Sequence, residues 1–253
     1  MKNIVQSIDR ALSILEVLSD YEGGLGLTEI STKIDLHKST VYRLLSTLIY
    51  KGYVKQDKNN NKYKITFKLF ELGNKAVENI DILSVARPFI EQLMEQVNEV
   101  VHLVLLENQD IIYIDKVESY NTIRMHSNIG KRSPAYSTSV GKAIMAFLPE
   151  QKSDEIWENS NIEKHTEKTI TDYHKFKEEL ETIRKKYYAI DDEENELGVR
   201  CIGAPIFNHK KEPIAAISIS GPISRVTREK VEKIAQDVMK YSKMISEELG
   251  YRE

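Results

Sequence analysis

The sequence predicts an α+β chain of two modules, a small and mostly helical one followed by a larger one built on a mainly antiparallel sheet. Three observations support this fold class. Apolar residues recur at helical spacing up to about residue 50, alternate in short runs between residues 100 and 220, and return to helical spacing from Thr227 to Leu249. The 253 residues, 41% of them apolar, suffice for one large or two modest cores.

Composition bears on the compartment and excludes several kinds of site. No apolar run approaches the length that spans a bilayer, and the amphipathic start MKNIVQSIDRAL lacks the apolar block of a secretory signal. The single cysteine, Cys201, excludes an internal disulfide and a multi-cysteine metal site. We therefore expect a cytoplasmic protein that does not insert into a membrane.

The chain begins with two predicted helices. The first has apolar residues at helical spacing, namely Ile4, Ile8, Leu12, Leu15 and Leu18. In the second, Leu27, Ile30 and Ile34 share a face, and Thr28 is placed to cap the N-terminus.

A third helix follows a tight corner and ends near Gly52. Its apolar stripe consists of Val41, Leu44, Leu45, Leu48 and Ile49. The opposite face offers hydroxyls, a phenol and a cation, the groups that reach phosphates and base edges in a DNA major groove. They belong to Ser39, Thr40, Tyr42, Arg43, Ser46 and Thr47. The second and third helices therefore predict a helix-turn-helix whose later helix reads DNA.

Local charge supports this interpretation. Between Ser31 and Thr66, eight Lys or Arg stand against Asp35 and Asp57, whereas the whole chain has a net charge of −3. A basic island on an acidic protein is typical of a phosphate-binding module. The alternative is a small helical bundle with a solvated basic face.

A predicted β-hairpin at residues 53–65, with a polar turn at Asn59–Asn61, follows the reader helix directly. A winged helix has this arrangement, and the wing can offer Lys55, Lys58 and Lys62 to backbone phosphate.

On the reader helix, we expect Arg43 to contact a base edge, with a surface salt bridge as the alternative. We expect the remaining candidates to hold phosphate and so to fix position without reading sequence. They are Lys38, Ser39, Thr40 and Tyr42.

Two more helices connect the modules. Residues 67–79 predict a helix with Phe67, Phe70, Val77 and Ile80 as its apolar positions, interpreted as a linker or, alternatively, as the last helix of the first domain. Asp81 and Pro88 bracket a junction, and Ser84–Val97 predicts a helix with a stripe of Val85, Phe89, Leu93 and Val97. The expected domains are 1–66 for DNA binding, 67–80 for the linker and 81–253 for the second module.

The second module begins with strands. Residues 100–107 and 111–119 predict a hairpin, and 122–127 a further strand. A loop, 128–137, leads into a helix at Val140–Leu148, capped by Ser137, Thr138 or Ser139. A charged helical region and a helix capped by Thr171, at 172–188, follow. The last predicted elements are a hairpin of 199–207 and 213–220, and a long helix from Thr227 to Leu249 that Gly250 ends.

Four segments of the chain resemble the IclR family of bacterial transcriptional regulators. They are SIDRALSILEVLS, LTEISTKIDLHKSTVYRLLSTLIYKGYV, YSTSVGKAIMAFLP and VRCIGAPIFNHKKEPIAAISISGP. The first two are shared by many winged-helix proteins, whereas the last two, in this order and spacing, are more specific. The resemblance covers nearly the whole chain.

The resemblance implies an N-terminal winged helix, a linker helix and a C-terminal GAF-like domain that binds a small organic acid. It also implies a homodimer or dimer of dimers on palindromic operator DNA. We expect a repressor of a catabolic operon whose DNA affinity depends on the bound effector. Two reader helices would then lie roughly 34 to 36 Å apart.

Residues and resemblance both indicate where the effector binds. The N–H groups of a first helical turn suit a carboxylate, and Ser139, Val140 and Gly141 lie where a loop becomes a helix. Side chains alternate along a strand, so Ser218 and Ser220 share a face, with Cys201 on the neighbouring strand. The family resemblance adds Asp191. It also indicates a departure, because many members have alanine where this chain has Ser137.

Each of these residues has a simpler interpretation. Cys201 can be a small buried apolar side chain, and the serines can be capping or sheet-facing hydroxyls. Residues 191–194 can form a solvated acidic loop. A carboxylate at Asp191 repels an acidic effector unless it binds a hydroxyl or is protonated.

Two other functional classes remain as alternatives. A thiol-dependent or other small-molecule enzyme could use Cys201, but a thiol cycle normally needs a resolving cysteine. The six histidines show no paired metal spacing, so we expect neither a metal, a cofactor nor catalysis. A winged-helix protein-interaction adaptor would leave Lys38 and Arg43 without a role, and a steep loss of DNA affinity with salt would separate the regulator from the adaptor.

Overall fold

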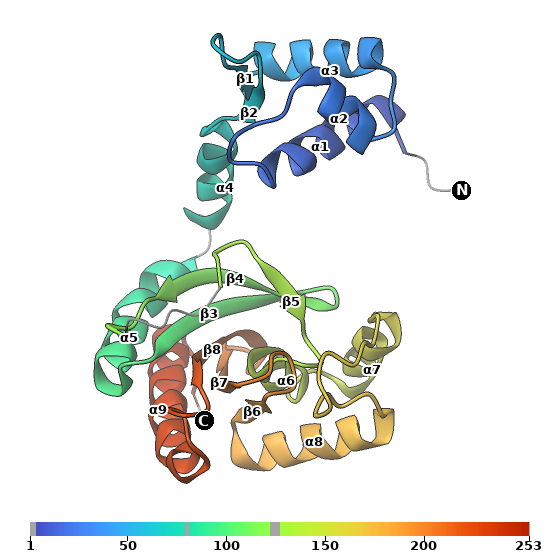
Figure 1. Ribbon diagram of the computed structural model, residues 1–253. Coiled ribbons are helices and arrows are strands. Elements are labelled where there is room, and N and C mark those ends of the chain that lie inside the picture. Colours follow the sequence, from blue (N-terminus) through green and yellow to red (C-terminus); the bar gives the residue numbers. More distant parts are fainter. Residues whose placement is uncertain (1–3, 79–80, 122–126, 253) are drawn as a thin grey trace. The chain divides into compact units, whose positions relative to one another are not determined.

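The computed structural model describes residues 4–252 except 79–80 and 122–126 (Figure 1). The chain divides into two compact units, Met1–Asn79, called unit 1, and Ile80–Glu253, called unit 2. In the described part of the chain, no helix combines the length and the apolar character that a membrane crossing needs.

Unit 1 is a winged helix. Its elements, in order, are α1 (Gln6–Ser19), α2 (Leu27–Lys33), α3 (Lys38–Tyr50), β1 (Val54–Gln56), β2 (Tyr63–Ile65) and α4 (Lys68–Glu78). The two strands pair antiparallel with Val54 opposite Ile65, as the predicted wing requires. Backbone hydrogen bonds in both directions between Leu25 and Tyr63 attach the wing to the segment before α2. α4, the predicted linker, belongs to unit 1, and the apolar positions Val77 and Ile80 lie outside the described side chains.

The apolar face predicted for α1 is wrong over its first half. Ile4, Ile8 and Leu12 are 59%, 59% and 53% exposed, whereas Ile14 and Leu18 are fully buried. A spacing of four residues advances about 40° more than one helical turn, so residues 4, 8 and 12 drift away from a straight stripe. Ala11, Leu15 and Leu18 stay on the core side together with Ile14.

The cap predicted for α2 is also wrong. Gly26 is the N-cap, Thr28 lies within the first turn, and the Glu29 carboxylate accepts the Gly26 N–H at 2.7 Å. An acidic side chain at the third helical position can satisfy the start of a helix as a threonine does.

Unit 2 contains a six-stranded antiparallel sheet in the order β5-β4-β3-β8-β7-β6. The strands are β3 (Val100–Glu107), β4 (Asp110–Val117), β5 (Arg132–Pro134), β6 (Ala189–Asp192), β7 (Val199–Phe207) and β8 (Pro213–Pro222). The central contact pairs Val100 with Ser220 and Val104 with Ala216, and β7 pairs with β8 so that Cys201 faces Ser220.

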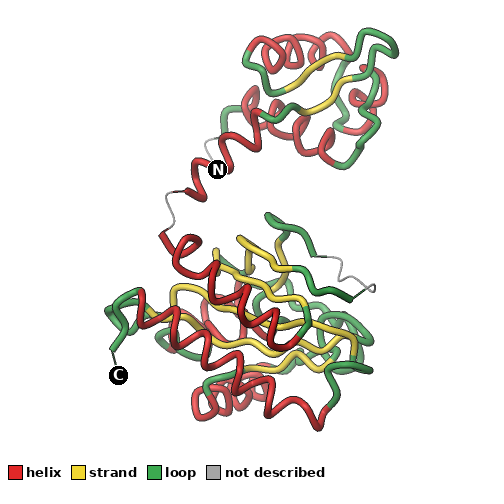
Figure 2. The backbone as a smooth tube through the Cα atoms, turned by 90° about the vertical axis from the view of Figure 1, so that its left-hand side faces the viewer, coloured by secondary structure: helices red, strands yellow, loops and turns green. Residues whose placement is uncertain are grey.

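Helices cover both faces of this sheet (Figure 1, Figure 2). One face carries α5 (Asp81–Val97) and α9 (Val231–Glu248), which pack on sheet residues such as Leu103, Ile202 and Ile217. The other face carries α6 (Ser139–Met145), α7 (Glu150–Asn159) and α8 (Tyr173–Lys186), with Val104 and Ala216 in their core. Neighbouring residues of one strand thus serve opposite cores, and the predicted α+β fold class is confirmed.

Several boundaries in unit 2 differ from those predicted. α5 runs through Pro88 without a junction, because burial of Ile82, Ala86, Ile90 and Leu93 offsets the hydrogen bond that proline removes. Of its predicted stripe, Leu93 is buried, whereas Val85, Phe89 and Val97 are only partly buried.

The segments on either side of β4 also differ from expectation. The strand predicted at 122–127 lies mostly outside the described residues. β4 pairs instead with β5, inside the segment predicted as a loop, and Pro134 is tolerated there because β5 is an edge strand. β6 was not predicted at all, although it forms the opposite edge of the sheet.

Helix starts in unit 2 also shift by a residue or more. Thr138 caps α6, one of the three residues expected, whereas Asp172 rather than Thr171 caps α8 by accepting the Lys175 N–H at 2.9 Å. A short 3₁₀ turn at Arg228–Lys230 precedes α9.

Candidate functional site

α3 places its polar residues as the sequence predicts. Val41, Leu45 and Leu48 are buried against the rest of unit 1, which turns the opposite face to solvent. Tyr42 is 57% exposed and Arg43 is exposed beside it. Of the other candidates, Lys38 and Ser39 are exposed and Thr40 is half-buried.

The cations of this face have no acidic neighbour in the described part of the chain. No carboxylate lies within ion-pair distance of Arg43, which leaves the surface salt-bridge interpretation without a partner. On the wing, Lys55 and Lys58 are exposed and Lys62 is half-buried. His37, the N-cap of α3, makes no side-chain capping bond, and the Thr40 N–H donates to the His37 carbonyl at 2.9 Å, which leaves the N–H groups of Lys38 and Ser39 available to an anion.

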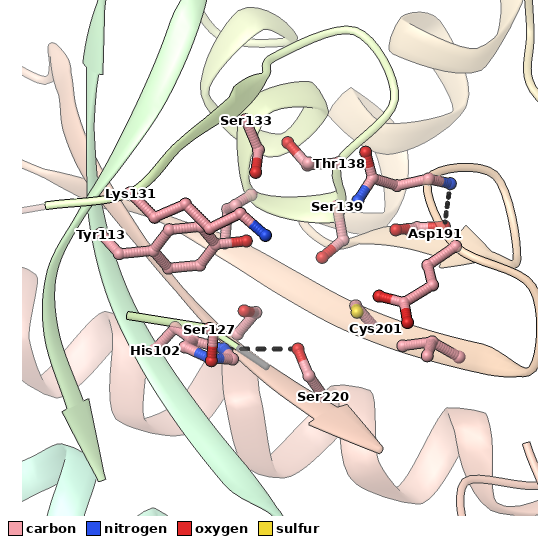
Figure 3. A pocket seen from close by; sticks show the side chains of 15 residues that line it. His102, Tyr113, Ser127, Lys131, Ser133, Thr138, Ser139, Asp191, Cys201 and Ser220 are labelled. Atoms are coloured by element: carbon pink, nitrogen blue, oxygen red, sulfur yellow. Dashed lines mark hydrogen bonds between the residues drawn. The ribbon is translucent and has the colours of Figure 1, made fainter. Parts of the chain in front are cut away.

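Unit 2 contains a small cavity on the α6 side of the sheet (Figure 3). Its volume is ≈ 50 Å³, which is room for about four water molecules. Six of the seven predicted effector residues line it, namely Ser139, Val140, Asp191, Cys201, Ser218 and Ser220.

Gly141, the seventh predicted residue, does not line the cavity. Its N–H donates to the Thr138 hydroxyl at 3.2 Å, so this amide is not free for a ligand. A Cβ at position 141 would lie 2.2 Å from the carbonyl oxygen of Ala135. The glycine therefore permits a close approach between α6 and the preceding loop, and its role is packing.

A group of residues on the β3–β4 side of the cavity was not predicted from the sequence. His102, on β3, bonds Ser127 at 2.7 Å through Nε2 and Ser220 at 3.3 Å through Nδ1 (Figure 3). Burial, and then the charge of Lys116, lower the pKa of His102 to about 3, so the ring is neutral. A lone histidine in the apolar run VVHLVLLE was the one signal that could have indicated it.

Tyr113 and Lys131 complete this side. The Tyr113 ring packs edge-on against His102 at 5.0 Å between centroids, and burial raises the pKa of its phenol to about 12. Lys131 is exposed, yet lines the cavity from the turn before β5 (Figure 3). No local pattern distinguishes this lysine from the many others. The remaining missed residues are Ser127, Ser133, Thr138, Asn195, Glu196 and Val199.

Asp191 forms the opposite side of the cavity and is 4% exposed. Its Oδ1 accepts the N–H groups of Glu194 at 2.8 Å and Asn195 at 3.3 Å. Burial raises the pKa of this carboxyl to about 7, although the Lys142 ammonium lowers it. The alternative interpretation of a solvated acidic loop is therefore wrong for Asp191, and its carboxyl is partly protonated at neutral pH.

Cys201 lies opposite Asp191 in the strand pairing. Burial and the nearby Asp191 charge raise the pKa of its thiol, which is therefore uncharged at neutral pH. A thiol in this state is a poor nucleophile. In the described residues, no group of three His, Cys, Asp or Glu is arranged to hold a metal ion.

Comparison with known families identifies both units. The IclR helix-turn-helix domain matches residues 7–58, and the bacterial transcriptional regulator IclR C-terminal domain matches residues 74–247. The chain is 36% identical over 249 residues to the HTH-type transcriptional regulator KdgR of Escherichia coli, covering 98% of this chain and 94% of that protein. It is 35% identical over 244 residues to the transcriptional repressor IclR of Escherichia coli, covering 96% and 89%.

Solved structures agree. The crystal structure of the Thermotoga maritima IclR is similar with a TM-score of 0.84 at 36% identity, covering 97% of this chain and 99% of that one. The C-terminal domain of E. coli KdgR is similar with a TM-score of 0.62 at 31% identity, covering 68% of this chain and all of that one.

Proposed function

Because the chain belongs to the IclR family and is a DNA-binding transcriptional regulator, we propose that a small organic acid in the unit 2 cavity controls its affinity for an operator. The cavity is the observation that carries this proposal. It is lined by many polar side chains, has room for only a few heavy atoms, and lies within one unit, whereas the basic face of α3 lies within the other.

The lining of the cavity offers a cation and hydroxyl donors to an acid, beside the carboxyl groups of Asp191 and Glu196. Among the described lining residues, Lys131 is the one cation, and hydroxyls at Ser139, Ser218 and Ser220 can donate to a carboxylate. Asp191 can accept a hydrogen bond from a ligand hydroxyl when it is ionised, or donate one to a ligand carboxylate when it is protonated. A small ligand with one carboxylate and a second polar group fits this arrangement.

DNA recognition is assigned to α3 and the wing. Arg43 reads a base edge, since it is exposed and unpaired within the described chain, while Lys38, Ser39, Thr40 and Tyr42 position the helix on phosphate. Lys55, Lys58 and Lys62 of the wing contact the adjacent backbone. The regulator acts as a homodimer or a dimer of dimers on a palindrome in the cytoplasm.

We assign it the role of a repressor of a catabolic operon, as two relatives are named a transcriptional repressor and an acetate operon repressor. The effector regulates only if it binds two arrangements of the protein with different affinity. Residues 67–80 are the segment through which such a difference reaches the DNA-binding unit.

A thermal-shift screen of carboxylated metabolites tests the proposal. A ligand that binds only the folded state stabilises it by about 2.7 kcal/mol at one hundred times its dissociation constant. Ser218→Ala and Ser220→Ala should reduce the shift and the effector response while DNA affinity without effector stays unchanged. Ser153→Ala is the matched control, because Ser153 is equally buried but lies on α7 away from the cavity.

Two outcomes would contradict the proposal. Unaltered binding of the screened ligand in both cavity variants would move the effector site elsewhere. DNA affinity that does not fall as salt rises would favour the adaptor alternative, since phosphate contacts release counterions.

A further inference from the structure

Lys142 is an unusual residue for the interior of unit 2. It lies on α6, one turn after Ser139, and is 0% exposed. Burying an ammonium costs several kcal/mol unless opposite charge and hydrogen bonds compensate. Burial alone would lower the pKa of Lys142, but the carboxylates of Glu194 and Glu179 hold it above its usual value, so the side chain is charged.

The carboxylates that compensate Lys142 come from two different elements. Its Nζ lies 2.5 Å from Glu194 Oε1, in the loop between β6 and β7, and 3.3 Å from Glu179 Oε1 on α8. Lys142 thus ties the β6–β7 loop to two helices. It does not line the cavity.

The β6–β7 loop carries one wall of the cavity. Asn195 and Glu196 line the cavity. The backbone N–H groups of Glu194 and Asn195 both donate hydrogen bonds to the Asp191 carboxyl. The Thr169 hydroxyl donates to the Glu194 carbonyl at 2.6 Å, which anchors the same loop from the segment before α8. The loop conformation that gives Asp191 its donors is therefore held from outside the cavity.

We propose that Lys142 is a positioning residue of the effector site: through Glu194 it holds against α6 the β6–β7 loop whose two N–H groups donate to Asp191, and it does so without touching the ligand. Hydrogen-bond donors and a nearby cation both favour the ionised form of a carboxyl group. This role of Lys142 rests on the proposed function, because it takes the cavity to be the effector site. Its consequence is chemical, because an ionised Asp191 can only accept hydrogen bonds from a ligand, whereas a protonated one can also donate to a carboxylate.

Several charged or titratable groups act on Asp191 from the elements around it. Lys142 on α6 favours its ionised form, whereas Glu194 in the loop disfavours it. Tyr113 on β4 and Cys201 on β7 face it with pKa values raised by burial, so both are neutral. Glu196 in the loop, and His102 and Lys131 on the far side, line the same cavity. Lys142 is the one of these groups that is both fully buried and cationic.

The test is the titration of Asp191 in the full-length protein without ligand or DNA. The carboxyl ¹³C resonance of Asp191 is followed against pH and is assigned by its absence in Asp191→Asn. The comparison is between Glu194→Gln and the double variant Glu194→Gln with Lys142→Met. Both lack the Glu194 charge, so the two proteins differ only at the ammonium, and no unpaired carboxylate is left at position 194.

The double variant should titrate about one pH unit above Glu194→Gln, because a nearby cation is removed from Asp191. The matched control is the pair of buried Glu99 and half-buried Arg225, whose atoms approach to 2.6 Å. Glu99→Gln with Arg225→Met should titrate like Glu99→Gln alone. Equal midpoints in the Lys142 pair, or an equal rise in the control pair, would overturn the proposal.

A second measurement leaves Lys142 and Glu194 unchanged. The ammonium ¹⁵N resonance of Lys142 in the wild-type protein should show a change at the midpoint of Asp191, and this change should be absent in Asp191→Asn. A change that follows its direct partner Glu194 should remain in both proteins. A wild-type resonance with no change at the Asp191 midpoint would overturn the proposal even if the double variant failed to fold. Because neither measurement uses an effector, their failure would leave the effector function of the cavity untouched.

Discussion

The reader face of α3 and the cavity of unit 2 use the same kinds of side chain in opposite states. Tyr42 on α3 is 57% exposed, whereas Tyr113 in the cavity packs edge-on against His102. Arg43 has no acidic partner in the described chain, whereas Lys142 is wholly buried between two carboxylates. A surface for DNA keeps its polar groups solvated until phosphate replaces the water, whereas a cavity for a small ligand fixes them beforehand.

This difference predicts where substitutions cost stability. Groups fixed by packing should affect folding when they are changed, whereas solvated groups should affect only binding. The four predictions that follow test this contrast, in order of decreasing effect.

Gly141→Ala should have the largest effect, because its Cβ would lie 2.2 Å from the Ala135 carbonyl oxygen. We expect the free energy of unfolding of unit 2 to fall by about 3 kcal/mol, measured by urea denaturation. Gly73→Ala is the matched control. No atom lies within 4 Å of a Cβ there, so the change should stabilise α4 by about 0.5 to 1 kcal/mol. Equal stability of both variants would break the contrast.

Arg43→Ala should weaken binding to a DNA fragment selected by the protein from a random pool by about 1–3 kcal/mol and relax its sequence preference. Fluorescence anisotropy against a scrambled fragment measures both, and the free energy of unfolding should stay within about 0.5 kcal/mol. Lys210→Ala, at an exposed turn of unit 2, is the control. If the wild type bound both fragments equally, Arg43 would have no reading role to lose.

Asp191→Asn should remove a pH dependence of stability. The pKa of Asp191 is about 7 in the folded protein, above the usual 3.8 of an aspartate, so between these values the folded protein holds a proton that the unfolded chain releases. The contribution of Asp191 to stability is therefore greatest at low pH and falls as pH rises, by about 1 kcal/mol per pH unit between pH 5 and 6. Urea denaturation at several pH values should show this slope disappear in Asp191→Asn but persist in Asp20→Asn. An unchanged slope would mean that Asp191 is not the group responsible.

Lys58→Ala should have the smallest effect. As a phosphate contact of the wing, Lys58 should contribute equally to selected and scrambled DNA. The slope of log affinity against log salt should decrease by about 1. Asn59→Ala, the neighbouring wing residue, should leave the slope unchanged, and a loss confined to selected DNA would contradict the phosphate role.

The sequence predicts unit 1 well because local periodicity and turn chemistry determine it. α2, α3 and the wing follow from patterns within about forty residues, and the positions of Arg43 and Lys58 on exposed surfaces follow from them. The error in α1 arose because Ile4, Ile8 and Leu12 are apolar yet exposed. Hydrophobicity alone does not say which of two apolar faces enters the core.

The cavity is less predictable because strand pairing between distant segments forms it. Ser218, Ser220 and Cys201 share one hairpin, so alternation along neighbouring strands suffices to group them. His102 joins them only because β3 lies next to β8, 118 residues away in the chain. The sequence predicts the Gly141 N–H as a ligand donor, because no sequence pattern shows that this N–H already donates a hydrogen bond to the Thr138 hydroxyl.

The pairing of β3 with β8 also determines the order in which the newly made protein can fold. The winged helix has its last wing strand once Ile65 has left the ribosome, whereas the centre of the six-stranded sheet waits for Pro222. At roughly 5–20 residues per second, that interval lasts on the order of ten seconds. A nascent chain thus completes its DNA-reading unit well before the proposed effector cavity of the second unit can form.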